Sequence, residues 1–321
     1  MIFEKQIEKV YRATLYGRCD DNGTAFYYSH KDFKGLNAQP YTFTSSTGNK
    51  LKGYFYSYEN PIPNRLIVFD HGYGGGHRSY MKEIEMLCRQ GYKVFAYDHT
   101  GCMESEGDGC GGFAQSLHDL DDCITALKAD ENTNTSDISV IGHSWGGFST
   151  MNIAALHPDI THVVVISGFV SVDEMVKQNF SGLLKGYRKH IYGIEQQANP
   201  KHVGFNGAET LSKTDAKVLL IYSDNDALVK KEIHFDALKN ALENKENVTL
   251  LLVKNKGHNP NYTENAVKLL GDYGRAKGKA IKKKLLNTDE DKKKFVASFD
   301  WDKMTEQDEK VWKEIFNTLD K

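Results

Sequence analysis

The sequence predicts an α/β protein built on a mostly parallel, doubly wound sheet of about eight strands, and three observations support this fold class. Short apolar runs alternate with segments of helical periodicity through the middle of the chain, which is typical of parallel strands covered by helices on both faces. Upstream, two runs alternate apolar and polar residues on either side of Thr47-Gly48-Asn49, which indicates an antiparallel hairpin at the sheet edge. A length of 321 residues fits an α/β enzyme of one domain with insertions.

The expected elements follow one another in a regular order. The hairpin strands are expected at residues 41–44 and 51–56. The buried strands are expected at residues 66–69, 93–97, 138–141, 162–167, 217–222 and 248–253. Helices are expected at about residues 78–90, where Gly91 ends the helix, at about 115–128, and from 147 until Pro158 stops the pattern.

The interval between Ser167 and Ala216 breaks this order because it contains no clear strand. Apolar residues recur there at helical spacing, which favours a small helical cap inserted after a strand; the alternative is one connecting helix and a long loop. After residue 271 a Lys-rich run precedes an amphipathic segment, which indicates a solvated helical face and a docked terminal helix, or else a partner-binding arm. The predicted division is an N-terminal extension (1–40), a core (41–168 and 216–271), a cap (169–215) and a C-terminal helical extension (272–321).

Composition excludes several classes of partner. Acidic and basic residues nearly balance, 43 against 41, so the net charge of −2 suggests neither nucleic acid nor an anionic membrane surface as a partner. The first nine residues carry charge where a signal peptide would be apolar, and no run is long enough to span a membrane, so a cytoplasmic protein is expected. The five cysteines are odd in number and form no CxxC pair, so we expect reduced thiols and no metal; they are Cys19, Cys88, Cys102, Cys110 and Cys123.

The segment from Gly142 to Gly146 reads Gly-His-Ser-Trp-Gly, between a β-branched strand and a helix. A turn this tight holds Ser144 in a strained backbone conformation, with its hydroxyl exposed at the top of the sheet. Side chains in place of the two glycines would collide with the neighbouring strand and helix. Ser144 is therefore the candidate nucleophile.

A serine nucleophile needs a histidine to accept its proton and an acid to orient that histidine. In a doubly wound sheet both should follow the carboxyl ends of later strands. Asp226 follows the strand ending at Tyr222, and His258 follows the last strand, so the chain order is serine, acid, histidine. Asp224 is the alternative acid, although it lies closer to the strand end and is better placed to accept turn amides.

The negative oxygen of a tetrahedral intermediate needs two N–H donors. One is expected from Trp145, directly after the serine, and the other from Tyr73 in the glycine-rich loop of residues 71–77. A phosphate-binding loop is the alternative reading of these glycines, but no Gly-Lys-Ser/Thr follows them. His143 is interpreted as packing beside the tight turn at Ser144, and His71 as shaping the loop of residues 71–77.

Together these motifs resemble the α/β-hydrolase superfamily over roughly residues 41–270. The resemblance lies in Phe69-Asp70-His71-Gly72-Tyr73-Gly74-Gly75, Asp98-His99-Thr100-Gly101 with Ser105-Glu106-Gly107, Gly142-His143-Ser144-Trp145-Gly146-Gly147, Asp224-Asn225-Asp226 and Gly257-His258. It is strongest with the branch that contains serine aminopeptidase-like hydrolases, monoacylglycerol lipases and small-ester esterases. The resemblance implies a triad of Ser144, Asp226 and His258, an oxyanion hole at Tyr73 and Trp145, and no cofactor.

The leading hypothesis is a serine hydrolase that cleaves carboxylic esters through an acyl-enzyme. The alternatives are an amide or thioester hydrolase, for which Glu104, Glu106 and Asp108 would offer an amine clamp, and a non-catalytic binding protein. The substrate is expected to be a small ester or acyl compound with a short, medium or aromatic acyl group. The residues expected to bind it are Gly74, His77, Phe169, Met175, Phe180 and Leu183. The alternative for the cap residues among them is that they only pack the cap onto the core.

Overall fold

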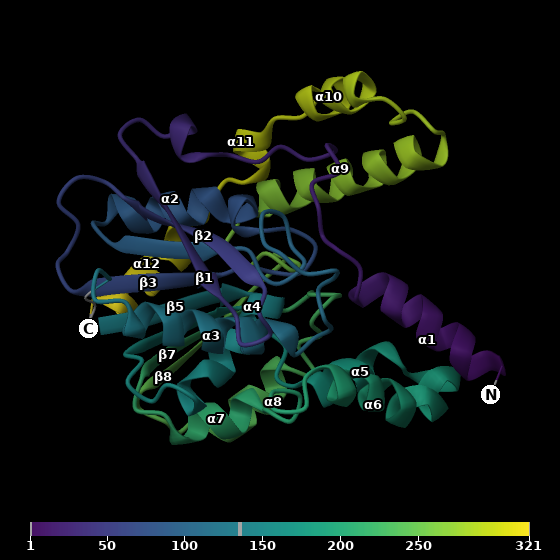
Figure 1. The fold of residues 1–321 in the computed structure, drawn as a ribbon, viewed down its shortest axis with the longest axis horizontal. Helices are drawn as coiled ribbons and strands as arrows, with labels where there is room; N and C mark the ends of the chain where they lie inside the picture. Colours follow the sequence, from purple (N-terminus) through teal and green to yellow (C-terminus); the bar gives the residue numbers. More distant parts are fainter. Residues whose placement is uncertain (1, 134–136, 321) are drawn as a thin grey trace.

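The computed structural model describes residues 2–133 and 137–320, and its centre is one eight-stranded sheet (Figure 1). The strand order is β1-β2-β4-β3-β5-β6-β7-β8, in which β1 and β4 pair antiparallel with β2 and all other neighbours are parallel. The predicted fold class is therefore confirmed. The strands are β1 (Asn37–Thr44), β2 (Lys50–Ser57), β3 (Arg65–Asp70), β4 (Lys93–Tyr97), β5 (Asp137–His143), β6 (His162–Ile166), β7 (Lys217–Ser223) and β8 (Val248–Val253).

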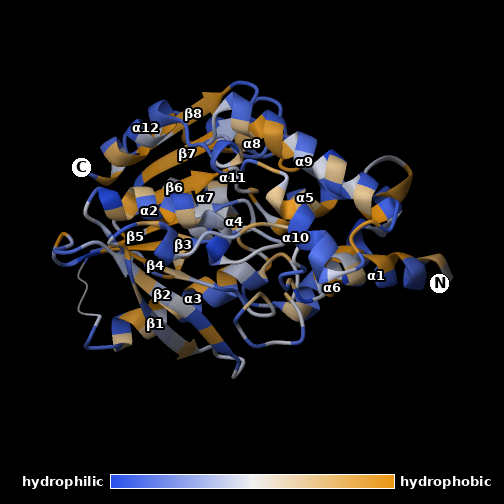
Figure 2. Ribbon diagram, turned by 90° about the horizontal axis from the view of Figure 1, so that it is seen from above, coloured by the Kyte–Doolittle hydropathy of each residue, from blue (hydrophilic) through white to orange (hydrophobic). Residues whose placement is uncertain are grey.

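Both faces of the sheet are buried because successive strand side chains point to opposite faces. Along β6, Val163 and Val165 join one hydrophobic cluster, whereas Val164 and Ile166 join the other. The apolar strands at the centre and the mixed colours of the surrounding helices are visible in Figure 2. The first cluster includes side chains of α3 (Gln115–Ala129), α4 (Trp145–Asn152), α7 (Gly207–Lys213) and α8 (Phe235–Leu242), and the second those of α2 (Met81–Arg89) and α12 (Glu309–Leu319).

The last helix belongs to the sheet's second face. Trp312, Ile315 and Leu319 of α12 are buried in the cluster beneath β6 and β7. The boundary predicted at residue 271 falls inside α9 (Glu264–Lys282), and α10 (Asp289–Ala297) and α11 (Trp301–Met304) complete a helical insertion between β8 and α12. Residues 1 and 321, at the ends of the two predicted extensions, lie outside the described residues.

The segment predicted as a cap lies between β6 and β7 in the chain and is mostly helical. It consists of α5 (Val172–Asn179), a short 3-10 helix η4 (Gly182–Tyr187) and α6 (Arg188–Ala198). α7, inside the range predicted as cap, contacts α4 and α8 of the core. Helix α1 (Ile2–Leu15) lies beside α5 and α6 at one end of the molecule (Figure 1).

One buried carboxylate joins α1, the cap and the core. Glu195 of α6 accepts hydrogen bonds from the hydroxyls of Tyr11 (2.7 Å) and Tyr16 (2.9 Å) and from the Phe113 N–H (2.7 Å). Three donors of this kind offset the cost of burying a carboxyl group. The N-terminal helix is thus a fixed part of the surface around the cap. Among the described helices, none is long and apolar enough to cross a membrane.

Candidate active site

Ser144 lies at the junction between β5, which ends at His143, and α4, which begins at Trp145. Its backbone has φ 58° and ψ −110°, a conformation rarely adopted by a residue other than glycine. A methyl group at Gly146 would overlap the backbone of Asp70, so the tight turn requires glycine there. The Ser144 N–H donates to the Ile166 carbonyl (2.9 Å), which fixes the turn on β6. The predicted strained turn is therefore present at this serine.

The structure brings Ser144, His258 and Asp226 together from three loops. The Ser144 Oγ lies 2.8 Å from His258 Nε2, and His258 Nδ1 lies 2.7 Å from Asp226 Oδ2. The other Asp226 oxygen accepts the N–H groups of Leu228 (2.8 Å) and Val229 (3.0 Å). Burial opposes the charge of Asp226, but the hydrogen bonds from His258 and these amides lower its pKa below the ordinary value.

Asp224, the alternative acid, has a different position. Its Oδ1 accepts the Asn255 N–H (2.9 Å), so its carboxylate satisfies a turn amide between the ends of β7 and β8. Only Asp226 of the two contacts the His258 ring among the described residues. Asn225 adds a second brace because its side-chain oxygen accepts the Gly257 N–H (2.8 Å).

His143 connects the loop carrying His258 to the loop carrying Tyr73. Its Nε2 donates to the His258 carbonyl (2.8 Å), and its Nδ1 accepts from the Tyr80 hydroxyl (2.8 Å), which in turn accepts the Gly72 N–H (3.0 Å). Burial lowers the pKa of His143 to about 3, so the ring is neutral and can accept at one nitrogen while donating at the other. Sequence reasoning missed Tyr80, which falls inside the helix predicted at about residues 78–90.

The backbone N–H groups of Tyr73 and Trp145 have no acceptor among the described residues, and both residues line the cavity at Ser144. The Trp145 N–H is free because it is the first of α4. The Tyr73 ring packs edge-on against Trp145 at 5.5 Å between centroids, and its hydroxyl donates to the Thr14 carbonyl of α1 (2.6 Å). Side-chain contacts therefore help to fix the positions of the Tyr73 and Trp145 residues that carry these N–H groups.

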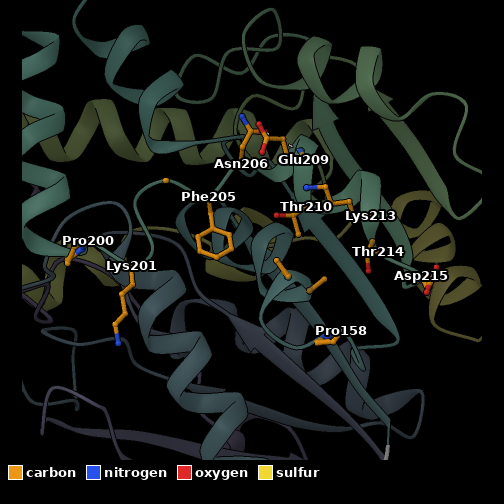
Figure 3. A pocket seen from close by; sticks show the side chains of 13 residues that line it. Pro158, Pro200, Lys201, Phe205, Asn206, Glu209, Thr210, Lys213, Thr214 and Asp215 are labelled. Atoms are coloured by element: carbon orange, nitrogen blue, oxygen red, sulfur yellow. Dashed lines mark hydrogen bonds between the residues drawn. The ribbon is translucent and has the colours of Figure 1, made fainter.

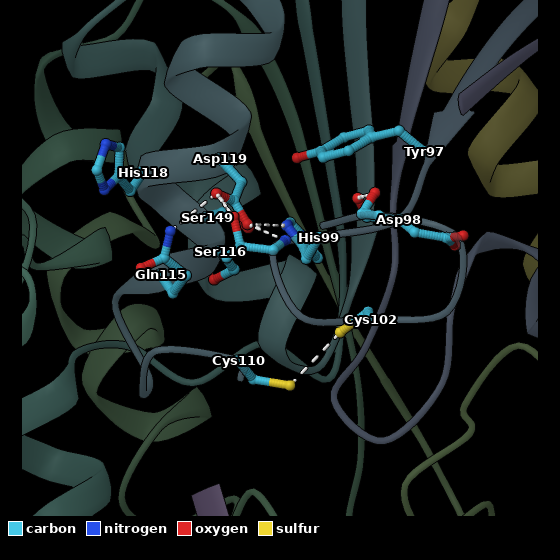
Figure 4. A network of polar contacts seen from close by, with 12 residues as sticks. Tyr97, Asp98, His99, Cys102, Cys110, Gln115, Ser116, His118, Asp119 and Ser149 are labelled. Carbon is cyan, nitrogen blue, oxygen red and sulfur yellow. Dashed lines mark hydrogen bonds and ion pairs between the residues drawn. The ribbon is translucent and has the colours of Figure 1, made fainter. Parts of the chain in front are cut away.

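A buried charged network supports these loops (Figure 4). The His99 ring lies between two carboxylates: its Nε2 is 2.8 Å from Asp70 Oδ1, and its Nδ1 is 3.2 Å from Asp119 Oδ2. The backbone N–H of His99 donates to His71 Nε2 (3.0 Å). Burial disfavours a charged His99, but the two carboxylates outweigh burial and raise its pKa to about 9. His99 is therefore an imidazolium at neutral pH, packed 4.7 Å from the Trp145 ring between centroids. Sequence reasoning missed this network because its members are distant in the chain.

A cavity of about 330 Å³ opens at the Ser144 hydroxyl. Two of the residues predicted to bind substrate, Phe169 and Met175, line it. The other lining residues are Leu15, Gly72, Tyr73, Tyr80, Phe113, His143, Trp145, Gln178, Asn179, Ala227, Leu228, Val229 and His258.

The structure places the other residues predicted to bind substrate away from this cavity. His77 is buried against Asp98 (2.8 Å) and the Tyr56 hydroxyl (2.9 Å), because a polar ring at that depth requires partners. Leu183 is 100% exposed on η4. Gly74, with φ 87°, is not among the residues that line the cavity, and Phe180 lines a second cavity.

The second cavity, of about 600 Å³, lies between α1 and the cap and shares Leu15, Phe113 and Asn179 with the first. Its lining is mostly apolar and includes Ile7 and Leu184. A third cavity, of about 540 Å³, lies beside α7, away from the serine (Figure 3). Within the described residues, one group has the composition of a metal site, and it lies behind the Tyr73 loop rather than in these cavities: Cys19, Cys102 and Cys110.

Comparisons with known proteins bear on the family and the fold. A family model described as serine aminopeptidase, S33, matches residues 61–248. The rat monoglyceride lipase is 30% identical over 122 residues, 36% of this chain and 37% of the lipase. RutD of Serratia proteamaculans, named as a carbamate hydrolase, is 27% identical over 180 residues, 55% of this chain and 61% of RutD.

Among solved structures, an esterase of Pyrococcus furiosus superposes with a TM-score of 0.59 at 19% identity, over 84% of this chain and 98% of the esterase. A likeness at this identity shows the shared fold. The chain spans less than two thirds of the length of the two curated relatives named above.

Proposed function

The chain belongs to the α/β-hydrolase family described as serine aminopeptidase, S33, and from this premise we propose that it hydrolyses carboxylic esters with Ser144 as the nucleophile. One observation carries the proposal: an unbroken hydrogen-bonded path from the Ser144 hydroxyl through His258 to Asp226, at 2.8 Å and 2.7 Å. A path of this geometry is what nucleophilic catalysis by serine requires.

In the proposed reaction Ser144 Oγ attacks the ester carbonyl while His258 Nε2 takes its proton. Asp226 holds the Nδ1–H tautomer and stabilises the imidazolium that forms. His258 then gives the proton to the leaving alcohol, which leaves an acyl group on Ser144. A water molecule, deprotonated by His258, attacks this acyl-enzyme and releases the carboxylic acid.

The N–H groups of Tyr73 and Trp145 are proposed to bind the oxyanion. Neither has an acceptor among the described residues, so neither must break a hydrogen bond in order to bind the developing charge. The imidazolium of His99, beneath the Trp145 ring, adds positive potential below the same loop. This prearranged site favours the tetrahedral intermediate over the planar ester.

The acyl group is proposed to lie against Leu15, Phe113, Phe169 and Met175, of which Leu15 and Phe113 also line the apolar cavity beside α1. Apolar surface on this side favours an acyl chain over a charged group. The two cavities share Leu15, Phe113 and Asn179 as lining residues, which supports medium acyl chains and extends the proposed range to long ones. Chain length is therefore expected to affect kcat/KM until the second cavity is filled.

The structure favours esters over aminoacyl amides. An aminopeptidase needs a carboxylate for the substrate amine, and no acidic residue lines the described Ser144 cavity. Glu104 is paired with Lys52, and Glu106 accepts the Lys50 N–H (2.8 Å), so both side chains brace β2. Comparing p-nitrophenyl esters with aminoacyl p-nitroanilides tests this preference directly.

The decisive experiment is hydrolysis of p-nitrophenyl esters from acetate to palmitate by wild type, Ser144→Ala and Ser212→Ala. Ser144→Ala is expected to lower kcat by about a million-fold, leaving only residual oxyanion catalysis. Ser212, a half-buried serine of α7 that donates to the Glu209 carbonyl, controls for loss of a hydroxyl. Turnover of Ser144→Ala at the wild-type rate, or wild-type protein that a fluorophosphonate does not label, would refute the proposal.

A further inference from the structure

Three cysteine sulfurs converge behind the Tyr73 loop. The Cys110 Sγ lies 3.2 Å from Cys19 Sγ and 3.6 Å from Cys102 Sγ, and all three sulfurs lie within 4.8 Å of one another. Cys102 and Cys110 are buried, and Cys19 is half-buried, so the cluster is open on one side. Figure 4 shows Cys102 and Cys110 facing each other. We refer to Cys19, Cys102 and Cys110 as the thiol cluster.

The backbone holds the thiol cluster together. The Cys19 N–H donates to the Gly101 carbonyl (2.9 Å), and the Met103 N–H donates to the Cys19 carbonyl (3.0 Å). The Cys110 N–H donates to the Gly17 carbonyl (3.3 Å). Three backbone bonds therefore align the segment after α1 with the loop after β4, so convergence of the sulfurs does not depend on side-chain rotamers alone.

Two glycines permit this close approach. A methyl group at Gly101 would overlap the Gly109 backbone, and one at Gly109 would overlap the Tyr16 carbonyl oxygen. Arg18 closes the arrangement from outside, because its guanidinium donates to the carbonyls of Gly107 (2.6 Å) and Met103 (3.1 Å). The two segments that carry the sulfurs are therefore held together by contacts within the chain.

We propose that the thiol cluster binds one soft cation of the Zn²⁺ or Cu⁺ type through three thiolates. Metal–sulfur bonds of about 2.3 Å place three sulfurs roughly 4 Å apart around one ion, which matches the spacing with small side-chain movements. Thiolates select soft cations over Mg²⁺ or Ca²⁺. Binding releases one proton from each thiol to solvent, and the open side leaves a further position for water.

The sequence alone predicted no metal because the ligands lack CxxC spacing and come from two separate segments. The bound ion would connect residues 17–19 to residues 101–110. It would also lie beside the loop that carries the Tyr73 N–H, because Tyr73 and Gly74 are neighbours of the Cys19 thiol. The ion is proposed as a structural support for that loop, and this inference does not depend on the ester substrate.

The test uses the full chain, reduced and freed of metal, with Zn²⁺ and Cu⁺ titrated separately under anaerobic conditions against chromophoric chelators. The wild type is expected to bind one equivalent of one or both ions, and Co²⁺ is expected to give a thiolate-to-metal charge-transfer band. Cys110→Ser and Cys19→Ser are expected to weaken binding by more than the roughly 10–100-fold that loss of an outer hydrogen bond costs. Cys123→Ser removes a buried thiol outside the cluster and is expected to retain binding.

Circular dichroism of each variant reports folding independently of metal. If Cys110→Ser does not fold, the half-buried Cys19→Ser variant decides the question. Binding unchanged in the folded cluster variants would overturn the proposal. Failure of the wild type to bind either ion would also overturn it.

Discussion

The buried carboxyl of Glu83 should make folding stability fall as pH rises toward neutrality. Glu83 lies on α2 with 1% of its surface exposed, and its Oε1 accepts the Asn261 side-chain amide (3.1 Å). Asn261 follows His258 by three residues and also donates to Gln307 (2.9 Å), so the carboxyl supports the loop that carries the histidine. Burial, partly offset by these polar neighbours, raises the pKa of Glu83 from 4.5 to about 7.

The magnitude follows from that shift. Between pH 4.5 and about 7 the folded protein holds a proton on Glu83 that the unfolded chain has released, so the free energy of unfolding decreases as pH rises through this interval. Each pKa unit corresponds to about 1.4 kcal/mol, and the loss over the whole interval is therefore about 3 kcal/mol. Glu83→Gln keeps the shape and removes the ionisation.

Urea unfolding of wild type and Glu83→Gln, measured from pH 5 to pH 8, isolates this contribution. The stability of the variant relative to wild type is expected to rise by about 2–3 kcal/mol across the range. Because only the pH dependence of the difference is used, any constant cost of the amide cancels. Glu59→Gln, at an exposed carboxyl, should give a difference within about 0.5 kcal/mol at every pH. A difference for Glu83→Gln that is equally constant would refute the reasoning.

Three further substitutions test the site and its frame. Asp226→Asn should lower kcat for p-nitrophenyl esters by about 1,000- to 10,000-fold, because the amide no longer holds the required imidazole tautomer, whereas Asp224→Asn should retain turnover within about tenfold. Tyr80→Phe should lower the free energy of unfolding by about 1–3 kcal/mol and reduce kcat, because it leaves buried polar groups on two active-site loops unpaired. The control is Tyr58→Phe, which loses a half-buried hydrogen bond. Gly109→Ala should lower the free energy of unfolding by about 3 kcal/mol or more, because its methyl group meets backbone atoms that cannot move aside. The first argument is contradicted if the two Asp variants have equal kcat, and the second if the two Tyr variants are equally stable. The third is contradicted if Gly109→Ala leaves the melting temperature unchanged.

The sequence by itself determined the fold class and the candidate nucleophile. Period and length of apolar runs identify buried parallel strands because each strand must bury both faces, and this requirement is local. The turn at Ser144 is likewise local, since the flanking glycines are needed wherever that backbone path occurs. Chain order then pointed to Asp226 and His258, and in the structure Asp226 is hydrogen-bonded to His258, which is hydrogen-bonded to the serine.

Only the tertiary structure decided which residues surround the hydrogen-bonded path from Ser144 through His258 to Asp226. The links from Tyr80 to His143 and from Glu195 to Tyr11 join residues 63 and 184 positions apart, and no periodicity encodes such pairings. The same holds for substrate contacts: Leu183 and Met175 have similar hydrophobicity and helical spacing, yet one is fully exposed and the other lines the Ser144 cavity. Periodicity selects a face of a helix, but the packing of that helix against the core decides whether the face is filled, lines a cavity or contacts solvent.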